Sequence, residues 1–263
     1  MRAPWIADVL RAAGLNVVEE PGWESRGKEF VSIDGHMAHH TASPKTSTLA
    51  VNLSVVINGN SVAPGPIANV LLWRDGTCHV IASGRCNHAG KGVLPWVPLD
   101  QGNTHLLATE AVNDGIGELW APEMVEAYEI GTAAMLRHLG LGSDRATTHS
   151  EYAPTRKIDP AGPTGGRIAT LPGRSTWSPV AWRERIADRL RVPVPPPSSG
   201  SPLEDDPMIL TNREPWFGAP AGTAKFKMQA NGRLKLLTPA EWDAECNGTP
   251  ISNAATGELG VDS

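Results

Sequence analysis

The chain has few cysteines, no long apolar run and no cluster of basic residues. Its 263 residues include three cysteines, Cys78, Cys86 and Cys246, and an odd, widely spaced set is not typical of a disulfide framework or a zinc knuckle. No apolar run approaches a membrane span, and the N-terminus has no apolar stretch of the secretory type. The formal net charge is −5 without any basic run, which argues against nucleic acid as a partner. We therefore expect a protein that is made in the cytoplasm and does not insert into membranes.

Residues 192–202 separate two regions of different composition. This segment contains five prolines, and proline supplies no backbone donor for a helix or an inner strand. Residues 203–263 hold nine acidic and five basic residues, whereas residues 1–202 hold nineteen and eighteen. The sequence thus predicts a first domain at 1–191, a Pro/Ser-rich linker at 192–202 and a small module at 203–263.

Apolar periodicity and turn residues predict an α/β fold (mixed α+β). Helices are expected over residues 3–13, 46–57 and 122–139, and from Ser178-Pro179 onward; strands are expected over 30–40 and 105–112, with a hairpin at 69–81 around Asp75-Gly76. The tail predicts a second hairpin over 225–237 around Asn231-Gly232 and a helix from Thr238. We expect a central mixed β-sheet flanked by helices, plus a small C-terminal module that contains a β-hairpin.

The candidate chemistry lies in the histidines, all eight of which fall between His36 and His149. His39 and His40 are neighbours on a predicted strand, so only one of them can face a given cavity. His149 and Asp159 would add a second imidazole and a carboxylate. Such a set suits zinc, and three protein ligands leave one coordination position open. Because His39 is more than a hundred positions from His149 and Asp159, the pattern indicates a metallohydrolase rather than a local zinc finger.

Five sequence blocks, in order, carry a family resemblance. The chain resembles the type 2 N-acetylmuramoyl-L-alanine amidases, whose zinc fold is shared with peptidoglycan recognition proteins and many phage endolysins. Its sequence is most similar in character to endolysins of phages that infect actinobacteria. The blocks are residues 38–43 (AHHTAS), 69–76 (ending in RDG), 87–92 (NHAGKG), 108–111 (ATEA) and 149–160 (ending in RKIDP).

The resemblance implies a set of metal ligands. Matched position by position, His39, His149 and Asp159 would bind Zn²⁺ at the floor of a surface groove, with His40 on the opposite face of the strand. Some relatives have cysteine at the third position. Here it is Asp159, which leaves the three cysteines outside the site.

The resemblance also implies catalytic and binding residues. Glu110 matches the general base, which takes a proton from the attacking water and passes it to the leaving amine. Lys157 matches a lysine that stabilises the oxyanion. Asn87 and His88 would contact the sugar or the stem peptide. The other histidines would be structural or surface groups: His36, His79, His105 and His138.

The expected activity is hydrolysis of the amide between N-acetylmuramic acid and L-alanine of the peptidoglycan stem peptide. As a phage endolysin, the protein would stay in the host cytoplasm until a holin releases it to the wall, and residues 203–263 would bind the wall or a partner. Two alternatives remain open: a cytoplasmic amidase that recycles soluble muropeptides, and a non-catalytic peptidoglycan-binding module. The linker and tail argue against the first, and the complete ligand set argues against the second.

Overall fold

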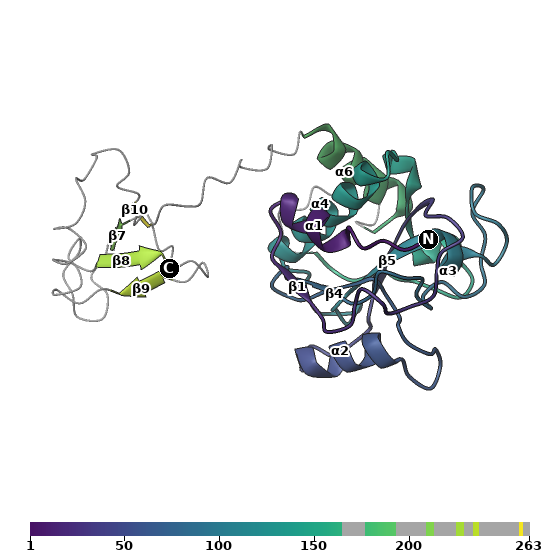
Figure 1. Ribbon diagram of the computed structural model, residues 1–263, viewed down its shortest axis with the longest axis horizontal. Coiled ribbons are helices and arrows are strands. Elements are labelled where there is room, and N and C mark those ends of the chain that lie inside the picture. The colour runs from purple at the N-terminus through teal and green to yellow at the C-terminus, as the bar shows by residue number, and fades with distance from the viewer. Residues whose placement is uncertain (165–176, 193–208, 213–224, 229–233, 237–257, 260–263) are drawn as a thin grey trace. The chain divides into compact units, whose positions relative to one another are not determined.

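The computed structural model describes residues 1–164, 177–192, 209–212, 225–228, 234–236 and 258–259 (Figure 1). The chain divides into two compact units, Met1–Pro196 and Pro197–Ser263. This division falls within residues 192–202, of which the structure describes only Val192, so the extended linker stays a prediction. Among the described helices, none has the length and apolar character to span a membrane.

The first unit is built on a six-stranded mixed sheet with the order β1-β4-β3-β5-β2-β6. Only the β3–β4 pair is antiparallel; the other neighbours run parallel. The strands are β1 (Val17–Glu19), β2 (Gly35–His40), β3 (Val70–Leu72), β4 (Cys78–Val80), β5 (Leu106–Ala111) and β6 (Ala146–Thr148). Strand β2 is therefore an inner strand, and its six residues are all buried.

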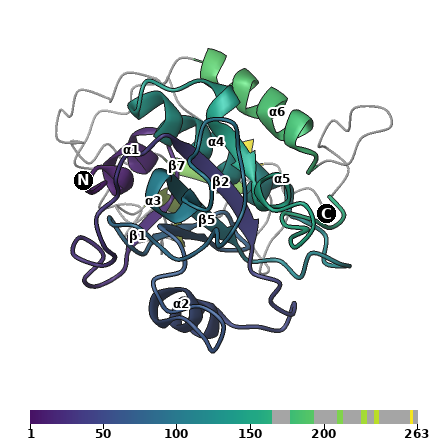
Figure 2. The same cartoon turned by 90° about the vertical axis from the view of Figure 1, so that its right-hand side faces the viewer.

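Helices cover both faces of this sheet. Three lie on one face, α1 (Ile6–Ala12), α4 (Pro122–His138) and α6 (Pro179–Arg191), and α2 (Leu49–Asn58) lies on the other, as both ribbon views show (Figures 1 and 2). Shorter helical segments connect the strands: α3 (Gly102–His105), η1 (Ser143–Arg145) and α5 (His149–Tyr152). The expected fold class, a mixed sheet flanked by helices, is confirmed.

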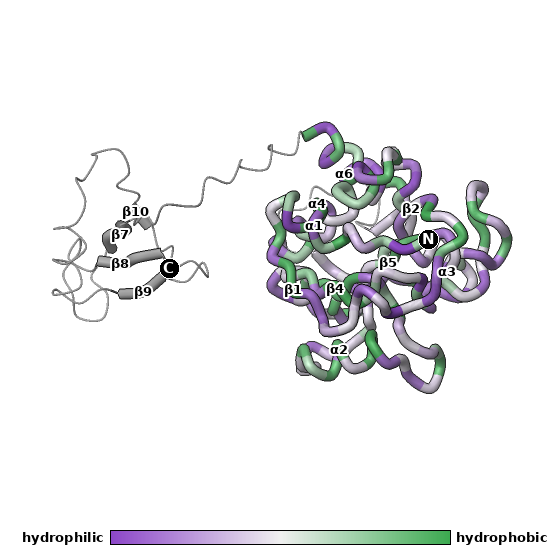
Figure 3. Tube along the Cα trace, viewed as in Figure 1, coloured by the Kyte–Doolittle hydropathy of each residue, from purple (hydrophilic) through white to green (hydrophobic). Residues whose placement is uncertain are grey.

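Helix α6 illustrates how local sequence sets an element. The Ser178 hydroxyl accepts a hydrogen bond from the Ala181 amide, and Pro179 occupies the first turn. Trp182 and Ile186 are fully buried at four-residue spacing, and hydrophilic and hydrophobic positions alternate along the helix (Figure 3). Burying a side chain of this kind stabilises the fold by about 1.5–3 kcal/mol, so this helix is held mainly by its apolar face.

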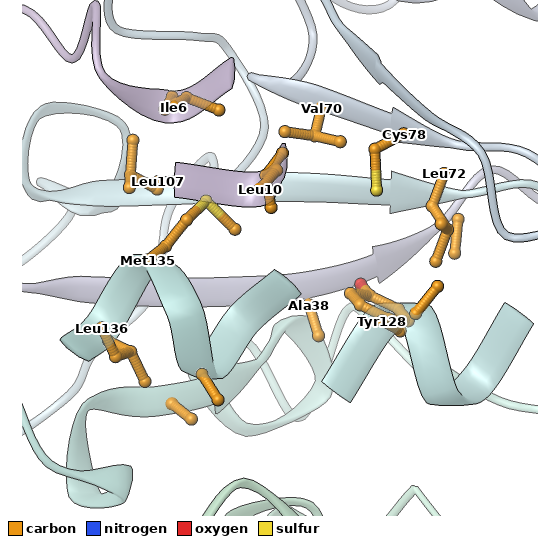
Figure 4. Close-up of a cluster of buried hydrophobic side chains, with 14 of the residues drawn as sticks. Ile6, Leu10, Ala38, Val70, Leu72, Cys78, Leu107, Tyr128, Met135 and Leu136 are labelled. Atoms are coloured by element: carbon orange, nitrogen blue, oxygen red, sulfur yellow. The ribbon is translucent and has the colours of Figure 1, made fainter. Parts of the chain in front are cut away.

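The alternation of side chains along β5 separates two parts of the core. Leu107 belongs to the cluster that packs against α1 and α4, together with Leu72 and Met135 (Figure 4). Leu106 and Ala108 belong to clusters on the opposite face. Because side chains two residues apart share a face, Glu110 lies on that opposite face.

Most predicted elements of the first unit are confirmed with shifts of a few residues at their ends. The helices at 3–13, 46–57 and 122–139 are α1, α2 and α4, and the hairpin at 69–81 is β3–β4. The sequence patterns do not predict strands β1 and β6. Each has only three residues, and the Ala-Thr-Thr of β6 shows no apolar alternation, so pairing with inner strands rather than local pattern produces them.

The second unit contains a four-stranded sheet with the order β10-β7-β8-β9. Its strands are β7 (Ile209–Asn212), β8 (Lys225–Met228), β9 (Leu234–Leu236) and β10 (Glu258–Leu259). Strands β8 and β9 pair antiparallel, with Phe226 opposite Leu236, as the hairpin prediction requires. The Asn231-Gly232 turn, the helix from Thr238 and Cys246 lie outside the described residues.

Candidate metal centre

His39 and His149 meet because of the register between two parallel strands. Ala38 on β2 pairs with Thr148 on β6, so the next residue of each strand emerges at the same edge. The Thr148 hydroxyl accepts a hydrogen bond from the Glu151 amide, which turns the chain into α5 directly at His149. The two rings lie 4.5 Å apart between centroids, and both side chains are almost fully buried.

Asp159 completes the cluster from the loop that follows α5. Its Oδ2 lies 3.0 Å from His39 Nδ1 and 3.0 Å from His149 Nδ1. One donor atom from each of the three residues can be chosen so that all lie within 4.8 Å of one another. The loop is held on both sides of the carboxylate, since the Ser150 amide donates to the Asp159 carbonyl and the Ala161 amide donates to His40 Nδ1. The structure thus brings together the three residues that the sequence predicts as metal ligands.

The residues of the cluster shift one another's pKa values. Burial by itself raises the pKa of Asp159, but the close contacts with the His149 and His39 imidazoles outweigh it and the pKa is well below the usual range. Burial lowers the pKa of His39 to about 4, with a further contribution from His149 that Asp159 offsets in part. Near neutral pH, His39 is therefore a neutral imidazole, the form that binds metals.

Glu110 stands beside His39 in the sheet. The two residues are register partners on β5 and β2, and Glu110 Oε1 lies 4.0 Å from His39 Nδ1. The Glu110 side chain is 12% exposed, and its Oε2 has no hydrogen-bond partner within the described part of the chain. Burial, with the nearby Asp159 charge, raises the pKa of Glu110 to about 8. A buried carboxyl group that makes no hydrogen bond within the described residues is typical of a functional group rather than a structural one.

Lys157 contributes positive charge to the same site. It is half-buried two residues before Asp159, and its amide donates to the Ala153 carbonyl. Its ammonium is one of the charges that lower the pKa values of His39 and Glu110. The side chain is therefore close enough to act electrostatically on both groups.

His88 and Asn87, the predicted substrate contacts, both contact backbone carbonyls within the protein. His88 is 8% exposed; its Nδ1 lies 3.0 Å from His39 Nε2 and its Nε2 lies 3.2 Å from the Leu106 carbonyl. Both ring nitrogens thus have protein partners, which leaves neither free for a substrate. The Asn87 side-chain Nδ2 donates to the Pro64 carbonyl, and for Asn87 a role in substrate binding stays a prediction.

The other histidines lie away from the cluster, as expected. His40 faces the side opposite to His39, where its ring packs edge-on against Trp120. His36 is held by the Thr109 hydroxyl. The remaining ones contact Glu20, the Gln101 carbonyl and the Trp5 ring: His79, His105 and His138. Cys78 and Cys86 are buried thiols whose pKa values burial raises, to about 12 for Cys78, and neither belongs to the cluster.

Tyr128 is a site residue that the sequence does not single out. Its hydroxyl accepts a hydrogen bond from the His39 amide at 2.7 Å and lies 2.9 Å from the Thr109 carbonyl. Its ring packs against Trp177 and Trp182. From the sequence, Tyr128 belongs only to the apolar face of a helix; the hydroxyl on that face is the one signal of a polar contact.

Comparison with known proteins identifies a family for this chain. A sequence model of the family described as N-acetylmuramoyl-L-alanine amidase matches residues 29–162, which is half of the chain and includes all three cluster residues. A search of curated protein sequences found no significant match.

Several solved structures are similar to this chain at low identity. One is the endolysin N-acetylmuramoyl-L-alanine amidase LysCS from Clostridium intestinale URNW, with 14% identity, a TM-score of 0.39, and coverage of 57% of this chain and 90% of that one. Another is AmpDh3 from Pseudomonas aeruginosa in complex with anhydromuramic pentapeptide, with 16% identity, a TM-score of 0.40, and coverage of 54% of this chain and 60% of that one. A third is Drosophila peptidoglycan recognition protein SA, with 14% identity, a TM-score of 0.37, and coverage of 52% of this chain and 81% of that one. On the match of the family model to half of its length, the chain belongs to the N-acetylmuramoyl-L-alanine amidase family.

Proposed function

We propose that this protein is a zinc-dependent amidase that hydrolyses the bond between N-acetylmuramic acid and L-alanine in peptidoglycan. The observation that carries the proposal is the convergence of His39, His149 and Asp159, with the buried Glu110 beside them. Family membership supports peptidoglycan as the substrate. The metal is inferred from the chemistry of the three clustered side chains, and the reaction from the family resemblance.

The three metal-donor atoms suit a divalent cation better than they suit hydrogen bonds among themselves. His149 Nε2 lies 2.9 Å from the Ala89 carbonyl, and a carbonyl only accepts, so this nitrogen carries the proton. In a neutral ring, His149 Nδ1 then points a lone pair at the Asp159 carboxylate, which is an acceptor as well. Two imidazole nitrogens and one carboxylate oxygen are ligands that suit zinc, and a three-ligand set leaves a position for substrate or water.

Each protein group has a distinct part in the proposed reaction. When bound, Zn²⁺ would supply a Lewis acid that polarises the scissile carbonyl and makes water a better nucleophile at neutral pH. Glu110 removes a proton from the attacking water and delivers it to the departing L-alanine nitrogen. Lys157 stabilises the negative charge that develops on the carbonyl oxygen. The reaction needs no covalent bond between enzyme and substrate.

The raised pKa of Glu110 is consistent with this role. A general base works best when its pKa lies near the working pH, and burial moves the Glu110 pKa to about 8. A cation beside it would lower that value and favour the carboxylate. Glu110 can then hold the proton between its removal from water and its transfer to nitrogen.

For the biological setting we propose the role of a phage endolysin that a holin releases to the wall of an actinobacterial host. The resemblance of the five sequence blocks supports this role. Residues 203–263 would bind the wall and so raise the local substrate concentration. A muropeptide-recycling amidase would instead prefer soluble fragments, and a non-catalytic recognition protein would bind walls without cleaving them.

Digestion of purified actinobacterial cell walls tests the proposal. The zinc-loaded protein should reduce turbidity and release free L-alanine amino termini without new reducing sugar ends. The Glu110→Gln variant should neither reduce turbidity nor release amino termini. Binding to walls without any cleavage would favour the recognition module. Cleavage of soluble muropeptides with intact walls left untouched would favour the recycling enzyme.

A further inference from the structure

One loop contacts the outer nitrogen of both histidines in the candidate metal centre. His39 and His149 turn their Nδ1 atoms toward Asp159. On the far side of each ring, His39 Nε2 lies 3.0 Å from His88 Nδ1, and His149 Nε2 lies 2.9 Å from the Ala89 carbonyl. Two consecutive residues, His88 and Ala89, thus each contact one of the two histidines.

The partners of His88 determine where its proton lies. Its Nε2 is 3.2 Å from the Leu106 carbonyl, which can only accept, so Nε2 of His88 carries the hydrogen. In the neutral ring, His88 Nδ1 is then an acceptor, and it takes the Nε2 hydrogen of His39. The His39 Nδ1 atom is left with a free lone pair that points toward Asp159 and His149.

We propose that His88 is a positioning residue of the metal centre: it holds His39 in the tautomer whose Nδ1 is free to bind the metal. This inference rests on the proposed zinc-dependent function. It replaces the sequence-based interpretation of His88 as a substrate contact, because the ring is buried and both nitrogens are used within the protein. Histidine ligands generally need such a partner on their second nitrogen, and its loss lowers metal affinity by about 10–100-fold.

The loop that carries His88 is itself held in place. The Asn103 side-chain oxygen accepts hydrogen bonds from the His88 and Ala89 amides, at 2.9 and 2.8 Å. The Arg156 guanidinium donates to the Ala89 and Lys91 carbonyls, both at 2.7 Å. These bonds limit movement of the loop, so His88 can set the orientation of the His39 ring as well as its tautomer.

The test compares three variants of the full chain. His88→Leu removes the acceptor, whereas His88→Asn keeps an acceptor oxygen near the position of Nδ1. His105→Leu is the matched control, because His105 is also 8% exposed and bonds to the Gln101 carbonyl instead of a cluster residue. Two quantities are measured: the zinc dissociation constant, by competition with a chelator, and the tautomer of His39 in zinc-free protein above pH 7, by long-range ¹H–¹⁵N NMR.

The expected results separate positioning from general damage to the fold. In the parent, His39 should carry its proton on Nε2. His88→Leu should show mixed His39 tautomers and bind zinc about 10–100-fold more weakly, with His88→Asn closer to the parent and His105→Leu equal to it.

Three results would overturn the proposal. The first is a parent in which the His39 proton lies on Nδ1, which can be read even if His88→Leu does not fold. The second is parent-like zinc affinity in a folded His88→Leu variant, and the third is an equal loss in His105→Leu. A parent that binds no zinc would defeat the proposed function instead, while the NMR measurement would still decide the tautomer.

Discussion

Replacing Glu110 by glutamine tests the site most directly, because it changes charge with almost no change of shape. Glu110 Oε1 lies 4.0 Å from His39 Nδ1, and Oε2 has no partner among the described residues. Because the Glu110 side chain makes no hydrogen bond within the described residues, the substitution removes a proton acceptor without breaking one. We expect normal zinc content and a turnover lower by about 10²–10⁴-fold, the usual contribution of a general base.

The same substitution should stabilise the zinc-free protein at alkaline pH. The pKa of Glu110 rises from an ordinary 4.5 to about 8 in the folded state. The folded protein thus binds this proton more tightly than the unfolded chain does, and it loses stability as pH rises from 4.5 to 8. One pKa unit corresponds to about 1.4 kcal/mol, so the penalty at pH 8 and above is on the order of 2–5 kcal/mol. The amide of Glu110→Gln cannot ionise and avoids this penalty.

Denaturant unfolding of chelator-treated parent and variant measures this effect. The two free energies of unfolding should be similar near pH 5, and the variant should become the more stable protein as pH approaches 8. Zinc must be absent, because a bound cation would lower the Glu110 pKa and shrink the difference. A difference that does not change with pH, or a variant that is less stable at pH 8, would refute the assignment of Glu110 as a buried, unpaired carboxyl. Parent-like turnover would refute its role as the base.

Four further outcomes follow from the site and the domain organisation. His39→Ala and His149→Ala should each lose zinc, read by metal analysis, and activity; near-normal zinc in either variant removes that residue from the ligand set. Asp159→Cys should keep zinc, because a thiolate is an accepted ligand, and complete metal loss would point to another third ligand. Lys157→Ala should keep zinc and lose turnover by about 10²-fold; an unchanged rate would show that Lys157 does not stabilise the oxyanion. The carbonyl of Val192 accepts a hydrogen bond from Arg137, so a chain that ends at Val192 should fold and cleave soluble muropeptides normally but lyse intact walls more weakly. An insoluble product would show that the domain boundary is misplaced.

Elements with strong local signals could be predicted from the sequence. The Ser178-Pro179 pair begins α6, and the Asp75-Gly76 turn lies between β3 and β4, because capping and turn geometry depend on adjacent residues. Strand β6 has no such signal and exists because it pairs with β2. That pairing, which no local pattern indicates, is what brings His149 beside His39.

The amino-acid sequence specifies which residue types the site can use. Two imidazoles, a carboxylate and a nearby lysine are present in the chain, and the resemblance to a family assigns them to one centre. The two imidazoles and the carboxylate do lie together in the fold. The chemical identity of a donor atom is a property of its side chain, so the sequence is sufficient to predict it.

The orientation and charge of those residues depend on the tertiary structure. In the fold, the Nδ1 atoms face inward, His88 contacts His39 instead of an open surface, and the Tyr128 hydroxyl reaches the His39 amide. Glu110 is buried there and so has a raised pKa. The physical reason is that hydrogen-bond partners and desolvation depend on strand register and on loops that pack across long stretches of the chain, and a one-residue change of register would turn these side chains to the other face.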